Sequence, residues 1–249
     1  MTDRTGHRPV LGVTGMTKVR EKGGVSFELR VPQLLVRSRE FLAVIGPSGC
    51  GKSTLLDFLA LVLKPTTYKS YRLVTDGGQL DLGQLPEKRL AAVRRRDLGY
   101  VLQAGGLLPY LTVRDNILLP ARLNNLDRAT ALERLNLLAG RLKIVDQLTK
   151  KPGALSGGQR QRAAIARALI HQPRLVLADE PTAAVDFPTA QEISAIFREL
   201  TAGLGLALVM VTHDLALVRN LADRFVSFKV EKPDETHTIS TLREAKLNG

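Results

Sequence analysis

Hydrophobic and polar positions alternate in one stretch of this chain and run together in others. Residues Val25–Arg30 (VSFELR) alternate apolar and polar side chains, which predicts a strand with one buried face. Three other runs are apolar throughout: Phe41–Ile45, Leu175–Ala178 and Leu206–Val211. Continuous apolar runs are typical of parallel strands that are covered on both faces. The pattern therefore predicts an α/β fold built on a parallel sheet.

Segments with helical character separate these runs. Residues Ser53–Leu63 have the length of a helix and stop before Pro65, so the strand Phe41–Ile45, a glycine-rich turn and this helix open a βαβ unit. A further helix is expected at Gln159–Leu169.

The middle of the chain, roughly from Leu111 to Ile170, has a different composition. It is rich in Leu, Ala, Arg and Asn and shows helical periodicity in Thr130–Leu142, and we interpret much of it as a separate helical lobe. From Lys232 onward the apolar content falls, which predicts a surface extension.

The turn after Phe41–Ile45 carries candidate chemistry. It reads Gly46-Pro47-Ser48-Gly49-Cys50-Gly51-Lys52-Ser53, followed by Thr54, and matches G-x-x-x-x-G-K-[ST] between a predicted strand and a predicted helix. Its glycines let successive N–H groups point inward around an anion, and the helix adds the positive end of its dipole. Lys52 can reach the β- and γ-phosphates, and the Ser53 hydroxyl can ligate Mg²⁺. The chain is therefore predicted to bind a nucleoside triphosphate.

Two adjacent acids follow the apolar run Leu175–Ala178. Asp179 is placed to hold Mg²⁺, directly or through water, and Glu180 to polarise an attacking water as general base. In isolation, two acids at a strand end are as often ordinary turn residues. Behind a phosphate loop, we interpret them as catalytic.

A third motif reads Leu155-Ser156-Gly157-Gly158-Gln159-Arg160-Gln161-Arg162. Ser156 can cap the helix that follows, and the two glycines permit close backbone approach. A lone S-G-G is more often a plain helix start, but here it makes a second anion-binding helix end on one chain.

These motifs together resemble the nucleotide-binding subunit of an ABC transporter, from about Val25 to Val230. The resemblance implies a P-loop NTPase (RecA-like) core with a mixed sheet, an antiparallel β subdomain and an inserted α-helical subdomain. It also implies a single domain, residues 1–249, with its core at about 1–104 and 167–230, the helical part at about 105–166 and a C-terminal extension at about 231–249.

The resemblance further implies an assembly. In the family two cassettes pair head to tail, so Ser156, Gly157, Gly158 and Gln159 would contact the γ-phosphate bound by a second copy. An isolated monomer is therefore expected to hydrolyse ATP poorly.

Further family positions have counterparts in this chain. Gln103 matches the glutamine that reaches Mg²⁺ and the attacking water, although alone it would be taken for a solvated side chain at a strand end. His213 matches a histidine that contacts the γ-phosphate, and Asp186 matches an aspartate at the dimer interface. The segment 108–116 matches the part of the family that contacts the membrane subunit.

Two departures from the family pattern concern contacts around the nucleotide. The family usually has an aromatic residue in its N-terminal strand region to stack on adenine, but no aromatic precedes Phe27 here. We expect Arg20, or the neighbouring Val19, to cover the base instead, because a guanidinium can stack on a π face. The residues between Thr182 and Asp186 also differ from the usual spacing.

Composition limits the remaining possibilities. The 249 residues carry 36 Lys and Arg against 24 Asp and Glu, a formal net charge of +12. Such a surplus suits a nucleic-acid binder, a protein beside anionic lipid or one that handles phosphate ligands. Only 4% of residues are aromatic and there is no Trp, which disfavours base stacking with a nucleic acid. We see no membrane-spanning apolar run and no secretory signal, so we expect a soluble cytosolic protein.

The single cysteine, Cys50, excludes an intramolecular disulfide and a zinc cluster built on cysteines. It lies near a helix N-terminus, which would lower the pKa of its thiol. Alkylation is therefore expected to block ATP hydrolysis, with protection by ATP.

We conclude that the chain binds and hydrolyses ATP with Mg²⁺ and energises a transporter. The stretch from Gly99 to Leu119 looks most like the lipoprotein-releasing and macrolide-exporting type. The alternatives are an importer cassette for amino acids or other small solutes, a soluble ABC ATPase without a transport role, and a binding module that does not hydrolyse ATP. The expected partners are membrane-spanning subunits and a second cassette, with no nucleic acid, at the cytoplasmic face of a bacterial inner membrane.

Overall fold

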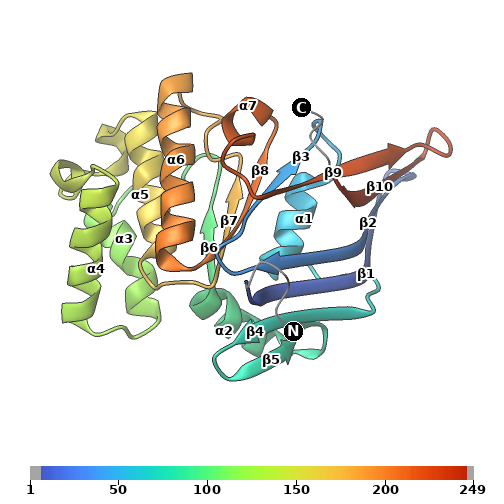
Figure 1. Cartoon of the computed structure of the whole chain (residues 1–249), viewed down its shortest axis with the longest axis horizontal. Coiled ribbons are helices and arrows are strands. Elements are labelled where there is room, and N and C mark those ends of the chain that lie inside the picture. The colour runs from blue at the N-terminus through green and yellow to red at the C-terminus, as the bar shows by residue number, and fades with distance from the viewer. Residues whose placement is uncertain (1–6, 246–249) are drawn as a thin grey trace.

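Residues 7–245 are described in the computed structural model, and their strands form one mixed sheet in the order β5-β4-β1-β2-β10-β9-β3-β8-β7-β6 (Figure 1). The strands are β1 Pro9–Lys22, β2 Val25–Arg37, β3 Phe41–Ile45, β4 Ser70–Thr75, β5 Gly78–Asp81, β6 Leu98–Val101, β7 Leu175–Asp179, β8 Ala207–Thr212, β9 Arg224–Glu231 and β10 His237–Glu244. The α-helices are α1 Lys52–Leu59, α2 Glu87–Asp97, α3 Val113–Leu123, α4 Arg128–Arg141, α5 Gly157–Leu169, α6 Phe187–Leu204 and α7 Leu215–Val218. Short 3₁₀ turns lie at Leu82–Gln84, Val145–Gln147 and Pro152–Ala154.

The parallel part of the sheet contains β3, β8, β7 and β6. Its continuous apolar runs arise because alternate residues of each strand enter different cores. In β3, for example, Phe41 and Ala43 belong to the core shared with the helical lobe, whereas Leu42 and Val44 belong to the core around α1. The expected buried parallel strands are confirmed.

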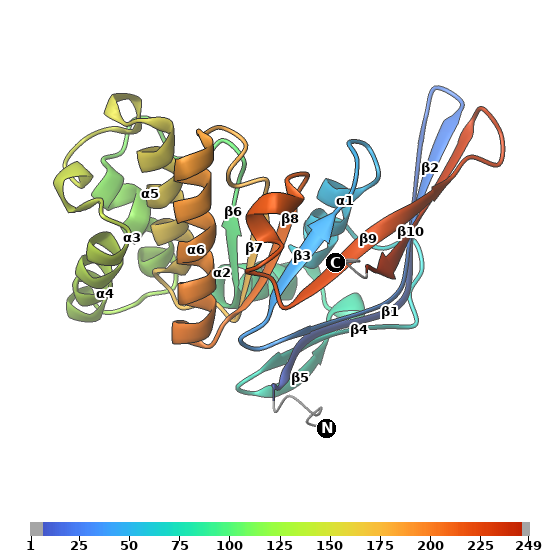
Figure 2. The same ribbon diagram turned by 45° about the horizontal axis from the view of Figure 1, so that its top comes forward.

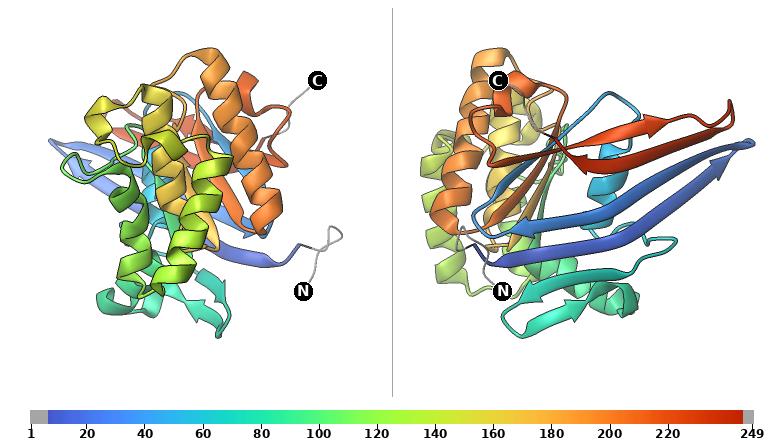
Figure 3. Two further views of the ribbon diagram at one scale, coloured as in Figure 1. Left: turned by 90° about the vertical axis from the view of Figure 1, so that its left-hand side faces the viewer. Right: turned by 45° about the vertical axis from the view of Figure 1, so that its right-hand side comes forward.

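The antiparallel part of the sheet, formed by β1, β2, β4 and β5, curls around α1 (Figures 2 and 3). Phe58 of α1 and Leu29 of β2 are fully buried in the core that joins the two parts. The strand expected at Val25–Arg30 continues to Arg37. The mixed sheet with an antiparallel β subdomain therefore confirms the predicted fold class.

Strand β10 corrects the expected surface extension. Residues 237–244 pair with β2 on one side and β9 on the other, and both Ser240 and Leu242 are buried. Ile239 and Leu242 are the apolar residues of this strand, so its apolar content is low although it pairs on both sides within the sheet. Residues 246–249 of the expected extension, and residues 1–6 of the expected core, lie outside the described part of the chain.

Helix α1 is shorter than expected. It ends at Leu59 rather than Leu63, and Leu61 adopts a left-handed backbone conformation. Two distant side chains bond carbonyls there, because the Tyr71 hydroxyl donates to the Phe58 carbonyl and Arg94 donates to the Leu61 carbonyl at 2.7 Å. Tertiary contacts thus help fix the end of this helix.

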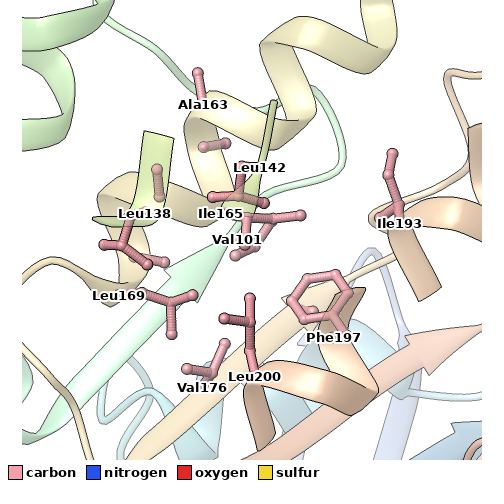
Figure 4. Close-up of a cluster of buried hydrophobic side chains, with 14 of the residues drawn as sticks. Val101, Leu138, Leu142, Ala163, Ile165, Leu169, Val176, Ile193, Phe197 and Leu200 are labelled. Carbon is pink, nitrogen blue, oxygen red and sulfur yellow. The ribbon is translucent and has the colours of Figure 1, made fainter. Parts of the chain in front are cut away.

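Helices α3, α4 and α5 lie together at one side of the sheet, with α6 next to them (Figure 1). Figure 4 shows how side chains of this layer, including Leu138, Ile165 and Phe197, gather near Val101 and Val176 of the sheet. The boundary expected near residue 166 falls inside α5, which is continuous. The proposed domain bounds remain a prediction.

Candidate functional site

A cavity of about 600 Å³ lies beside the loop that joins β3 to α1. Residues from three parts of the chain line it, namely the β1–β2 ribbon, the phosphate loop and the ends of β6 and β7. The lining consists of Arg20, Phe27, Ser48, Gly49, Gly51, Lys52, Ser53, Thr54, Gln103, Asp179 and Glu180. In α/β sheets, the carboxyl ends of parallel strands are where ligands bind.

The phosphate loop takes its shape from glycine and lysine. Gly49 and Gly51 have φ values of 77° and 102°, which side chains rarely permit. Lys52 is 7% exposed, and its Nζ donates to the carbonyls of Gly46 at 2.8 Å and Pro47 at 2.9 Å. The loop therefore closes on its own ammonium group, which stays at the cavity.

The two acids occupy different environments at the end of β7. Burial raises the pKa of Asp179, and the nearby charges of Glu180 and Asp57 raise it further, while a hydrogen bond from Ser53 opposes this. Glu180 has a left-handed backbone (φ 42°), and strain of this kind often marks functional sites. Its Oε1 lies 4.0 Å from Nζ of Lys52, so the catalytic candidate faces the phosphate-binding candidate.

His213 joins the site from the strand beside β7. Strand β8 pairs with β7 so that Val211 lies opposite Asp179, and His213 follows two residues later. Nδ1 of His213 donates a hydrogen bond to Oε2 of Glu180 at 3.1 Å. This bond leaves the other ring nitrogen available to a ligand.

Gln103 lines the cavity just after β6, and the loop that follows it is held by α5. Arg167 donates to the carbonyls of Gly105 at 2.9 Å and Gly106 at 2.6 Å. Gln161 donates to the Leu102 carbonyl at 3.4 Å. The glutamine is therefore connected mechanically to the helix that carries the third motif.

The third motif is not part of this cavity lining. Ser156 accepts a hydrogen bond from the Gln159 amide at 3.2 Å, and the Gln159 side chain accepts one from the Ser156 amide at 3.0 Å, which makes a capping box. A Cβ at Gly157 would lie 2.9 Å from the Ala184 carbonyl, and one at Gly158 would lie 2.7 Å from Thr189.

Asp186 lies in this second region too. It caps α6 through the amide of Thr189 at 3.0 Å, so the N-termini of α5 and α6 meet. The structure thus separates the predicted residues into two groups, one at the cavity and one at these helix ends.

Comparisons with known proteins identify the arrangement. The sequence model described as ABC transporter matches residues 29–183. The chain belongs to the ABC transporter family. The lipoprotein-releasing system ATP-binding protein LolD of Shewanella denitrificans is 39% identical over 231 residues, covering 92% of this chain and 97% of that protein. LolD 1 of Rhodospirillum rubrum is 40% identical over 199 residues, covering 80% and 85%.

A solved structure has the same fold as this ABC cassette. It is a dimeric ATP-binding cassette in a post-hydrolysis state bound to ADP and Pi, with a TM-score of 0.76 and 32% identity over 96% of this chain and 99% of that one. The predicted family is confirmed, and the chain is an ATP-binding and ATP-hydrolysing subunit of an ABC transporter. No helix within residues 7–245 is long and apolar enough to cross a membrane.

Cys50 corrects a prediction. Its side chain is 2% exposed in the core around α1, and it is absent from the cavity lining given above. Burial raises the pKa of the thiol, and the charge of Lys52 and backbone hydrogen bonds only partly oppose this. The expectation of a lowered pKa was therefore wrong, and it no longer supports rapid alkylation at this position.

Two residues of the cavity region were missed from the sequence. Phe27 lies directly opposite Arg20 in the β1–β2 register, and Asp57 of α1 forms an ion pair with Arg20 at 3.9 Å. The signal for Phe27 was its place in a strand next to that of Arg20, which only the register reveals. Val19 pairs with Glu28 on the opposite face of the ribbon, so Arg20 is the better candidate of the two.

Proposed function

We propose that this ABC cassette hydrolyses ATP between two copies of the chain and energises a transporter of the lipoprotein-releasing type. The observation that carries the proposal is the cavity in which Glu180 lies 4.0 Å from Lys52, with His213 bonded to Glu180 from the neighbouring strand. The lipoprotein-releasing assignment is supported by the two LolD relatives, which match at about 40% identity.

The chemistry follows from the residues at the cavity. Lys52 and the free N–H groups at the start of α1 bind the phosphates, because both present positive charge to one point. Glu180 orients a water for in-line attack on the γ-phosphate and accepts its proton. His213 holds the Glu180 carboxylate through Nδ1 and presents its second nitrogen to the γ-phosphate.

The donor set also fits Mg²⁺. Ser53, Gln103 and Asp179 offer a hydroxyl, an amide oxygen and a carboxylate at one cavity, and hard oxygen ligands are those that Mg²⁺ prefers. Burial, and secondly the charges of Glu180 and Asp57, raise the pKa of Asp179, so a cation at this place would stabilise its charged form. Residues 7–245 contain no group of three or more His, Cys, Asp or Glu side chains able to hold a metal. The phosphates would therefore complete the ligand set, and bound Mg²⁺ would neutralise charge on the β- and γ-oxygens.

A second copy completes the site. Ser156, Gly157, Gly158 and Gln159 form a helix end that does not line the cavity of its own chain, so we assign them to the γ-phosphate held by the partner. Asp186 lies next to them at the same surface. A head-to-tail pair places two ATP molecules between the copies, and loss of the γ-phosphate weakens their contact.

Membrane-spanning subunits receive this motion at the cytoplasmic face of the inner membrane. The segment 108–116 is the proposed contact. Asn116 fixes its shape, because the side-chain amide donates to the Leu108 and Thr112 carbonyls, both at 3.0 Å. Tyr110 is 68% exposed within the segment and offers an apolar surface to a partner.

Purification from native membranes tests the proposal. The tagged chain should retain a membrane-spanning partner identifiable by mass spectrometry, and the pair in proteoliposomes should release a lipoprotein to a soluble acceptor when ATP is added. Glu180→Gln should abolish release, whereas Glu199→Gln, on the exposed side of α6, should not. Recovery of a solute-import permease, or release that continues in Glu180→Gln, would overturn the assignment.

A further inference from the structure

The nucleotide cavity has two chemically different sides. Gln103, Asp179 and Glu180 come from the ends of β6 and β7 and present amide and carboxylate groups. Arg20 and Phe27 come from the β1–β2 ribbon and present a guanidinium and an aromatic ring. The phosphate loop belongs to both sides, since β3 lies between these parts of the sheet. A nucleotide with its phosphates on Lys52 therefore finds a surface suited to a base only on the ribbon side.

Phe27 lies against the start of α1. A Cβ placed on Gly51 would be 3.0 Å from Cζ of Phe27 and 3.3 Å from Cδ1 of Leu29. Leu29 is fully buried, whereas Phe27 is half-buried and lines the cavity. One part of the ring thus rests on the phosphate loop while another part remains open to a ligand.

Arg20 lies beside Phe27 because the two residues are directly opposite in the antiparallel register. Its guanidinium pairs with Asp57 at 3.9 Å, and the two side chains are 48% and 37% exposed. Asp57 is four residues after Ser53, so it lies one helical turn beyond the phosphate loop. The ion pair keeps the guanidinium at the cavity although it is partly solvated.

The chemistry of a guanidinium favours one purine. Arginine has five N–H donors and no acceptor. Guanine presents two acceptors side by side, N7 and O6, whereas adenine presents the acceptor N7 beside an amine donor. A guanidinium at the edge of a stacked purine therefore complements guanine better than adenine.

We propose that Phe27 is the stacking platform for the nucleotide base in this cassette, and that Arg20, positioned by Asp57, extends its specificity to GTP. This inference rests on the proposed nucleotide site and assigns the base-binding part of it. In this cassette an aromatic residue on β2 takes the role that the family usually gives to one on β1. A guanidinium in addition donates hydrogen bonds to the edge of the base.

Equilibrium binding to the full-length, nucleotide-free protein tests the platform. ATP, GTP and inorganic tripolyphosphate are titrated, each with Mg²⁺. Phe27→Ala should weaken ATP and GTP about 5- to 100-fold through loss of stacking, while tripolyphosphate binding stays unchanged. Phe27→Tyr should restore the affinity. Equal affinities of Phe27→Ala and the unmodified protein for ATP, or an equal loss for tripolyphosphate, would overturn the platform.

The same titrations test the guanidinium. The unmodified protein should bind GTP at least as tightly as ATP. Arg20→Ala should lower the ratio of GTP affinity to ATP affinity about tenfold. Asp57→Asn should shift the ratio in the same direction by less. Arg30→Ala is the matched control, since Arg30 pairs with Glu28 on the same ribbon at 2.7 Å. A strong ATP preference that is unchanged in Arg20→Ala would overturn this part.

Failure of the wider proposal gives a different result. If the cavity around Lys52 is not the nucleotide site, Lys52→Ala will leave the affinities for ATP, GTP and tripolyphosphate unchanged. If only the inference is wrong, Lys52→Ala will weaken all three ligands, Phe27→Ala will leave the affinity for ATP unchanged, and Arg20→Ala will leave the ratio of GTP to ATP affinity unchanged.

Discussion

Helices α1 and α5 both begin with glycine-rich sequence at places suited to an anion, yet their N-termini are capped differently. Helix α1 has Gly51 as its N-cap, in a left-handed conformation and without a side-chain hydrogen bond to its first turn. Helix α5 has Ser156 as its N-cap, and Ser156 and Gln159 satisfy each other's backbone N–H groups. The first turn of α1 therefore has no side-chain cap, whereas the first turn of α5 has already used part of its N–H donors.

On the proposal that both ends bind phosphate, the difference indicates the order in which they do so. The α1 end has Lys52 beside it and can bind alone, whereas the α5 end must share its capped N–H groups with an incoming oxygen. We expect the α5 end to add little to nucleotide binding by one chain and much to hydrolysis in the pair. Variants that affect only one end test this division.

The largest expected effect comes from Glu180→Gln at the α1 side. Removal of the general base should lower kcat about 100- to 10,000-fold. ATP affinity should remain, since Lys52 and the loop are unchanged. Steady-state phosphate release and ATP titration measure the two quantities, with Glu199→Gln as control. Turnover that stays close to the unmodified rate would remove Glu180 from the base role.

A change at the α5 side should separate hydrolysis from binding. A Cβ at Gly157 would meet the Ala184 carbonyl at 2.9 Å, so Gly157→Ala must displace the end of the helix. A displacement near 1 Å can lower kcat about 100-fold, whereas ATP affinity of the isolated chain should not change. Gly153→Ala is the control, because a Cβ there meets nothing within 4 Å. Equal loss of binding and hydrolysis in Gly157→Ala would contradict the division.

The link between the two sides is Arg167, which bonds the loop after Gln103 to α5. Hydrogen bonds to a charged group contribute about 1.5–3 kcal/mol, so Arg167→Ala should lower the free energy of unfolding by about 2 kcal/mol. It should also reduce stimulation of the ATPase by membrane subunits, which Arg167→Lys should only partly restore. Denaturant unfolding and ATPase assays with and without the partner check this, with the exposed Arg89→Ala as control. Full stimulation in Arg167→Ala would show that the loop does not need this link.

The smallest expected effect concerns Asp179 and pH. Burial raises its pKa above the ordinary value of 3.8, so the folded state binds this proton more tightly than the unfolded state. The native protein without nucleotide therefore loses stability as pH rises from 3.8 through the raised pKa, and Asp179→Asn avoids that loss. Thermal unfolding between pH 4 and 7 should show that the stability of Asp179→Asn increases relative to that of the unmodified protein as pH rises. A stability difference that is independent of pH would contradict the raised pKa.

Contiguous features were predictable from the sequence, and features formed across the sheet were not. Strand β3 has the expected bounds, because a fully apolar run before a glycine-rich turn leaves little choice. Strand β10 was missed because its pairing with β2 joins residues about 210 positions apart, and nothing local marks it. The end of α1 was missed for a similar reason, since the side chains of Tyr71 and Arg94 bond carbonyls at its end and just beyond it.

The same distinction holds at the site. Lys52 belongs to one contiguous motif and Asp179 with Glu180 to another, and the structure brings both motifs to one cavity. Phe27 and Asp57 required the β1–β2 register and the position of α1. Cys50 was misjudged because a helix N-terminus is a local feature, whereas its pKa depends on burial by the surrounding core.

The hydrogen bonds from Lys52 to the Gly46 and Pro47 carbonyls have a consequence for the catalytic cycle. They close the loop into a ring around the ammonium group. Oxygens of a triphosphate can replace these two carbonyls as partners of the ammonium group, so the loop does not need to refold. The chain's own atoms thus hold the shape of the loop, so a phosphate that binds Lys52 meets a ring of N–H groups that is already formed.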